Sequence, residues 1–205
     1  MIELITAGII LGLSAGFAPG PLLALLISET LRHGVGSGVR VAIAPLITDI
    51  PIIALTIFLS VVLADAELFI GLVSLAGGAF VLWLGISSLR IKHNTLEQPA
   101  EPPRSLAKGI ATNVLIPHPY IFWLTVGTPI LSQAMETGWM LPALFIFVFY
   151  SCLVGAKIGL AILTGRSRRF IQGKAYINIM RVLGVMMCLF ALILFGDGLR
   201  LAGIL

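Results

Sequence analysis

An apolar run from Ile5 to Ser28 is long enough to cross a membrane as one helix, yet Pro19-Gly20-Pro21 interrupts it. Proline has no backbone N–H, and its ring clashes with the carbonyl four residues earlier, so the carbonyls of Ala15 and Phe17 lose their helical partners. In lipid, a freed carbonyl is tolerated only where protein or a watery cavity satisfies it. We therefore expect a broken transmembrane helix here, with a simple proline kink as the alternative.

Five more apolar runs follow, each long enough for a crossing, which takes about 20 apolar residues. With a mean hydropathy of +1.09 and 11% charged residues, the chain is too apolar for a soluble domain. We predict an all-α integral membrane protein with six transmembrane helices. The predicted spans cover residues 5–28, 41–63, 68–89, 109–131, 139–164 and 176–199.

The basic residues of the predicted loops gather on one side of the membrane. The opposite side holds only Arg200, near the end of the chain. By the positive-inside rule, both termini face outward. No basic patch carries interleaved aromatic residues, so we expect no nucleic-acid partner. The ten residues of the basic side are Arg32, Arg40, Arg90, Lys92, Arg104, Lys108, Arg166, Arg168, Arg169 and Lys174.

The longest loop divides the chain into two related halves. Residues 90–108 contain three prolines and no apolar periodicity, which predicts a cytoplasmic linker between residues 1–89 and 109–205. Pro117-His118-Pro119 then repeats the first proline motif 98 positions later. Because each half has an odd number of spans, the second half enters the membrane from the other face. The chain is therefore predicted to be two inverted three-helix repeats, with helices 1 and 4 broken at the proline motifs.

The two breaks are expected near the middle of the membrane, because each lies about nine residues from its cytoplasmic helix end. After each break a new half-helix begins, and its first backbone amides have no helical partner. Two positive helix ends facing one region suit an anionic group such as a carboxylate. We predict a substrate seat made by Pro19, Gly20, Pro21, Pro117 and Pro119.

Asp49 and Lys157 are the deepest ionisable residues, in matching helices of the two halves. A charge inside a membrane is expensive, so each is a candidate functional residue. Lys157 could extend to the headgroups or pair with Asp49. Asp49 is too short to reach the headgroups, so it is expected to meet a substrate ammonium, a coupling proton or Lys157.

His118 and Asn113 are the polar side chains nearest the second break. His118 could relay a proton or be a hydrogen-bonded structural residue. Asn113 could bind a ligand, satisfy a freed carbonyl, or simply cap the break.

A stripe of glycines, Gly8, Gly12, Gly16 and Gly20, lies on one face of the first helix. Small residues let another helix approach closely. The sequence leaves open whether that helix belongs to the same chain or to a second copy in a homodimer.

The chain resembles the LysE/RhtB family of small bacterial amino-acid exporters along essentially its whole length. The resemblance rests on Gly16-Phe17-Ala18-Pro19-Gly20-Pro21, on Arg32-His33-Gly34, on Asp49 and on the second proline motif. It implies a six-span inner-membrane carrier for basic or neutral amino acids, driven by the proton gradient.

Three positions, in the two proline motifs, depart from the family pattern. Typical members have a polar residue, often Asn, after the first motif, where this chain has Leu22. Their second motif reads Asn-Pro-Lys, where this chain has Ile116-Pro117-His118. These changes alter the polar groups near the seat and so bear on the substrate more than on the family.

Two rival functions compete with amino-acid export. Distant relatives of the family move metals, but a divalent-metal exporter needs several ligands at depth, and Asp49 and His118 are the only candidates. A membrane enzyme or thiol-redox protein would need a nucleophile with its base, a metal cluster, or cysteines that exchange electrons. Cys152 and Cys188 stand singly in apolar runs. We therefore expect a transporter with no enzymatic activity, resident metal or cofactor.

Overall fold

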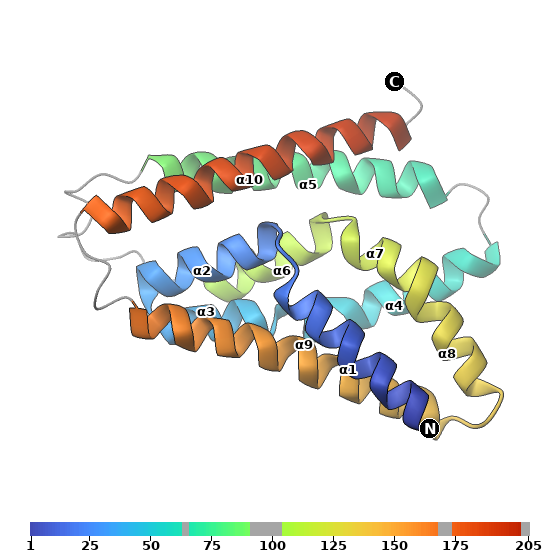
Figure 1. Ribbon diagram of the computed structural model, residues 1–205. Helices are drawn as coiled ribbons and strands as arrows, with labels where there is room; N and C mark the ends of the chain where they lie inside the picture. The colour runs from blue at the N-terminus through green and yellow to red at the C-terminus, as the bar shows by residue number, and fades with distance from the viewer. Residues whose placement is uncertain (63–65, 91–103, 168–173, 202–205) are drawn as a thin grey trace.

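The computed structural model describes residues 1–62, 66–90, 104–167 and 174–201, with side chains for all of these except 57–62, 66–70 and 174–176. Within these ranges every regular element is a helix, and the helices lie roughly along one long direction (Figure 1). The all-α prediction is therefore confirmed for the part of the chain that the structure describes.

Both proline motifs break their helices, as predicted. Helix α1 (Ile2–Phe17) ends before the first motif, and α2 (Pro21–His33) leaves at 61° to it. In the second half, α6 (Ser105–Leu115) is followed by a segment bent by 53°. That segment consists of α7 (His118–Phe122), the π-helix η2 (Trp123–Gly127) and α8 (Thr128–Met135).

Four further helical stretches are long and apolar enough to cross a membrane alone, and each bent pair counted as one span would raise the number to six. They are α3 (Val35–Ala42) continuing into α4 (Ala44–Val62), α5 (Ala66–Leu89), α9 (Met140–Ser167) and α10 (Lys174–Leu201). The inverted repeat itself stays a prediction.

Two predicted boundaries are shifted. The second span begins at Val35 rather than at residue 41, because Gly34, with φ of 92°, turns the chain sharply and lets a helix begin at once. The predicted linker 90–108 is helical from Ser105 onward, and its residues 91–103 lie outside the described ranges.

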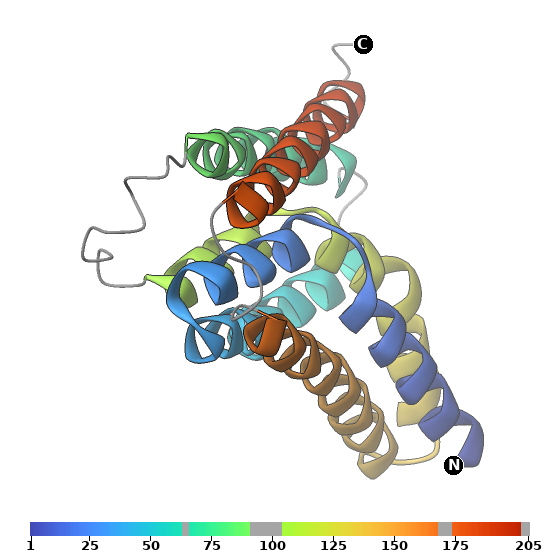
Figure 2. The same ribbon diagram turned by 60° about the vertical axis from the view of Figure 1, so that its left-hand side comes forward.

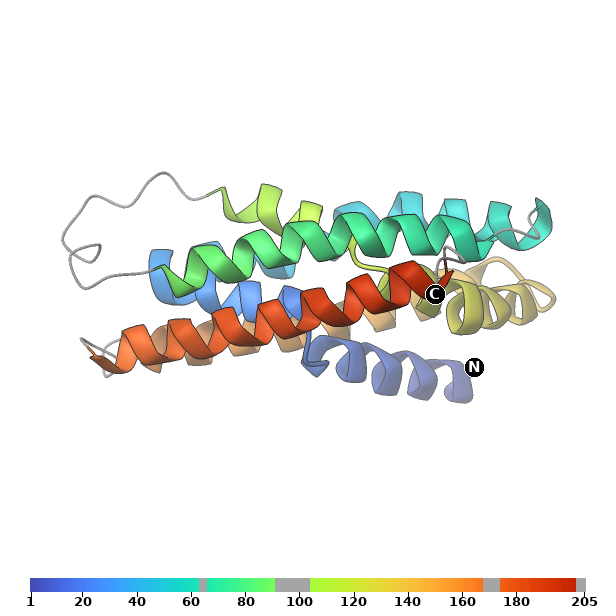
Figure 3. The same cartoon turned by 90° about the horizontal axis from the view of Figure 1, so that it is seen from above.

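The described termini of the chain and the turn between α2 and α3 lie at opposite ends of the molecule. The start of α1 and the end of α10 lie at one end, whereas the turn from α2 to α3 lies at the other (Figures 1 and 3). Each bent pair runs from one end to the other, and both breaks lie near the middle of this length. Both breaks are thus at a similar depth.

The helices of the two halves pack against each other rather than as two separate bodies. Helix α1 lies along α9. Helices α5 and α10 lie along each other and form a layer beside the remaining helices (Figure 2). The α5–α10 pair meets those helices chiefly through α2 and α6.

The glycine stripe of α1 meets α9 of the same chain. Gly8, Gly12 and Gly16 are buried, and a Cβ added to Gly12 would lie 2.4 Å from the carbonyl oxygen of Phe149. Gly20 has no neighbour within 4 Å of such a Cβ. The helix that approaches Gly8, Gly12 and Gly16 therefore belongs to the same chain and not to a second copy in a homodimer.

We predict that Gly12→Ala lowers the thermal denaturation temperature of the detergent-purified protein by about 3–10 °C, because the added methyl group pushes α1 away from α9. Gly155→Ala is the matched control, since nothing lies within 4 Å of its added Cβ. Equal denaturation temperatures for the two variants would contradict the close packing of α1 on α9.

Candidate functional site

Asp49 of α4 lies at the centre of a buried hydrogen-bond network. Its Oδ1 atom accepts from Asn113 Nδ2 at 2.6 Å and lies 3.3 Å from Thr48 Oγ1, and its Oδ2 atom accepts from Tyr150 OH at 2.8 Å. The side chain of Trp123, in η2, lies beside this carboxylate. Asp49 is only 5% exposed. The network joins α4 to α6, η2 and α9, whose contributing residues lie 64 to 101 positions later in the sequence.

This network satisfies a carboxylate with neutral donors. An ionised carboxylate is an acceptor with about four lone-pair sites, and the amide, hydroxyl and indole groups around Asp49 can fill them. The ion pairs between described residues do not include Asp49. A direct ion pair between Asp49 and Lys157, one of the two alternatives that the sequence left open for Lys157, is therefore not found among the described side chains.

The π-helix η2 brings Trp123 to this network. A Cβ on Gly127 would lie 2.1 Å from the Trp123 ring, so only glycine leaves room for the indole. Trp123 then stacks with Tyr150 and meets Phe149 edge-on, within an aromatic cluster beside Asp49. Single π-turns are frequent at functional sites, and the sequence showed no sign of this one.

Lys157 of α9 takes a position that the sequence did not predict. It is 4% exposed, and its Nζ donates to the carbonyl oxygens of Gly16 at 3.2 Å and Ala15 at 3.4 Å. These are carbonyls at the C-terminal end of α1, where the first break leaves acceptors without helical partners. The ammonium therefore satisfies the freed backbone and complements the negative end of the helix dipole.

The second break is satisfied differently. Tyr120 OH donates to the carbonyl oxygen of Val114 at 2.8 Å, so a side chain just after the break reaches back to the end of α6. Asn113 binds Thr48 and Asp49 rather than a freed carbonyl. Each break thus has a hydrogen-bond donor from the protein itself.

The other predicted site residues lie at the breaks with unequal exposure. Pro21 and Pro117 are buried, Gly20 and Pro119 are half-buried, and Pro19 and His118 are exposed. Neither α2 nor α7 has a side-chain cap from a described residue at its first turn. His118 is exposed, and both of its alternatives, a proton relay and a hydrogen-bonded structural residue, stay predictions.

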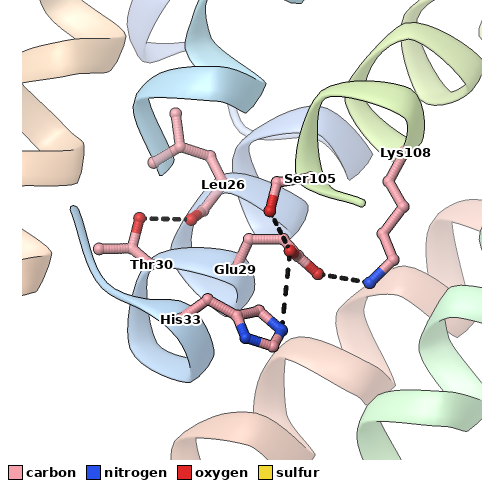
Figure 4. Close-up of polar contacts among 6 residues, drawn as sticks. All are labelled: Leu26, Glu29, Thr30, His33, Ser105 and Lys108. Carbon is pink, nitrogen blue, oxygen red and sulfur yellow. Dashed lines mark hydrogen bonds and ion pairs between the residues drawn. The ribbon is translucent and has the colours of Figure 1, made fainter. Parts of the chain in front are cut away.

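Sequence reasoning missed a second buried charged cluster, shown in Figure 4. Glu29 of α2 is 1% exposed and accepts from Ser105 Oγ at 2.5 Å and Lys108 Nζ at 2.7 Å, both from α6. His33 Nε2 lies 4.0 Å from the same carboxylate. Glu29 falls one residue beyond the predicted first span, so its depth was not recognised. The spacing of Glu29 and His33 by one helical turn was the available signal.

The described residues contain no group of three or more His, Cys, Asp or Glu side chains placed to hold a metal. Cys152 lies beside Gly12 of α1 and Cys188 beside Gly85 of α5, in different helix pairs, and both are unpaired thiols.

Comparison with known proteins gives one family match. The profile of the LysE type translocator family matches residues 13–198. The chain is also similar to the uncharacterized membrane protein YahN of Escherichia coli strain K12, with 25% identity over 189 residues that cover 89% of this chain and 84% of that protein. No solved structure matches.

We predict that Lys157→Met destabilises the protein by about 1–3 kcal/mol, because two carbonyls at the end of α1 lose a charged donor. The measurement is the thermal denaturation temperature in detergent. Arg166→Met, at an exposed position of the same helix, is the control and is expected to change stability by less than about 0.5 kcal/mol. A Lys157→Met protein as stable as the control would show that the ammonium does not support the break.

Proposed function

We propose that this chain, which belongs to the LysE type translocator family, exports amino acids or similar small zwitterions across the bacterial inner membrane, with proton coupling. The observation that carries the proposal is the buried Asp49 network beside two helix breaks at a similar depth. Discontinuous helices of this kind hold substrates near the membrane midplane in other transporters.

In this proposal the substrate lies between the breaks. Its carboxylate faces the N-terminal ends of the helical segments that begin at Pro21 and His118, where the backbone amides favour an anion. Its ammonium approaches Asp49. Since neutral donors already occupy the Asp49 oxygens, an ammonium or a proton must replace one of them, such as the hydroxyl of Tyr150. Exchange of these donors would link substrate binding to helix movement.

The same proposal assigns the coupling step to titratable groups near the breaks. Asp49 is the candidate for the coupling proton, and the exposed His118 is the candidate for its relay. Lys157 has the supporting role, because movement of α1 against α9 would uncover the carbonyls that it binds. Six crossings as an inverted repeat, with both termini outside, complete the topology that we propose. No observation in the described residues favours a metal cargo instead.

We predict that Asp49→Asn abolishes export while the protein still inserts and purifies, because an amide cannot attract an ammonium or hold a coupling proton. The measurement is the amino-acid content of medium from cells that produce wild-type protein, the variant or neither. An excess of one amino acid outside wild-type cells would identify the substrate.

Asp197→Asn is the matched control for this experiment, since it makes the same chemical change at an exposed position on α10. It is expected to export at the wild-type rate. Wild-type export by the Asp49→Asn variant would remove Asp49 from the transport mechanism. No amino-acid excess with wild-type protein would contradict the proposed substrate class.

A further inference from the structure

The Glu29 cluster borders a cavity between two groups of helices. The cavity has a volume of about 40 Å³ and lies where α2 and α6 meet α5 and α10. Its polar lining combines one carboxylate, two cationic side chains and three hydroxyls: Ser28, Glu29, Arg32, Ser87, Ser88 and Lys108. Both charges of an amino acid would therefore find partners in one place.

The Glu29–Lys108 ion pair is an unusual way to join α2 to α6. Glu29 is 1% exposed, whereas the Lys108 side chain is 25% exposed, so the pair runs from the interior toward the surface. Removing a carboxylate from water is expensive, and an apolar contact of similar size would often stabilise two helices as well or better. The buried charge therefore calls for a role besides holding the helices together.

We propose that Glu29 and Lys108 form a second, cytoplasmic substrate site, in which a zwitterionic amino acid inserts between the two side chains. Its ammonium takes the place of Lys108 at Glu29, and its carboxylate takes the place of Glu29 at Lys108, with Arg32 beside it. Every charge keeps an opposite partner, so the exchange avoids leaving a buried charge unpaired. The inference rests on the proposed export of zwitterions.

The size of the cavity fits a closed form of this site. About 40 Å³ holds roughly three water molecules and is too small for an amino acid. Binding must therefore separate α2 and α6, or move the α5–α10 pair away from them. Glu29 lies eight residues after Pro21, about 12 Å along α2 from the first break.

The position suits the side from which an exporter loads. Glu29 and Lys108 lie toward the end of the molecule that carries the turn from α2 to α3. By the positive-inside rule, that end faces the cytoplasm. An amino acid would meet this site first and the Asp49 region second.

The test measures uptake by inside-out membrane vesicles, whose outer face is the cytoplasmic face. The probe is a radiolabelled mixture of glycine, alanine, serine, threonine, leucine and phenylalanine. We expect Glu29→Gln and Lys108→Met each to raise the half-saturating concentration about tenfold or more, because each removes one charged partner of the zwitterion. The double variant Glu29→Gln/Lys108→Met removes both charges of the ion pair, so neither charge is left buried without its partner. It can therefore be measured if a single variant does not fold.

The charge-swapped double variant Glu29→Lys/Lys108→Glu distinguishes a substrate-binding role of the ion pair from a purely structural one. It restores an ion pair between α2 and α6 but reverses the orientation in which an amino acid could bind. We expect its half-saturating concentration to stay raised about tenfold or more. Return to the wild-type concentration would show that the pair is only structural and would overturn the site.

Amino-acid methyl esters and N-acetyl amino acids provide an independent measurement on wild-type vesicles, since each lacks one of the two charges. We expect neither to compete for uptake, and competition by both would contradict the site.

Glu3→Gln and Arg40→Gln are the controls, because both side chains are exposed and lie away from the cavity. Wild-type vesicles without any uptake would overturn the proposed function, whereas uptake unchanged in all Glu29 and Lys108 variants would overturn this site alone.

Discussion

The structure depends on satisfying backbone carbonyls that two helix breaks leave without partners inside an apolar protein. Lys157 does this for the end of α1, and Tyr120 does it for the end of α6. Lys157 can reach its carbonyls only because α1 lies directly against α9, and the glycines of α1 make that approach possible. The close packing of α1 on α9 and the buried ammonium of Lys157 therefore serve the same purpose, which is to keep a broken helix stable in an apolar protein.

A broken helix that is held by replaceable hydrogen bonds is also a helix that can move. The donors at the breaks and around Asp49 come from single side chains on neighbouring helices, so a ligand can compete with them one at a time. The Glu29–Lys108 pair repeats this arrangement nearer the proposed cytoplasmic face. Both polar sites lie at helix contacts that cross between the two halves of the chain. In the proposed function, the same contacts would connect substrate binding to rearrangement of the halves.

Local features of this fold could be predicted from the sequence, and contacts between distant residues could not. Proline chemistry predicted both breaks, apolar run lengths predicted the helices, and glycine spacing predicted a close helix neighbour. The partner of Lys157 could not be predicted, because Asp49 and the carbonyls of α1 are at similar depth and only packing decides between them. Glu29 was missed because the predicted first span ended with the apolar run at residue 28, one position earlier, whereas the side chain is in fact buried. The π-turn at Trp123 depends on tertiary contacts that leave no periodic pattern.

If the transport route passes the first break, position 20 must be accessible to water-soluble reagents from both faces of the membrane. A Gly20→Cys protein without Cys152 and Cys188 carries one thiol at a position where an added Cβ meets nothing within 4 Å. Labelling with a membrane-impermeant maleimide is measured in intact cells and in inside-out vesicles. We expect labelling from both faces, slowed by the exported amino acid. A thiol that reacts from neither face, or at a rate that no amino acid changes, would rule out a transport route past the first break.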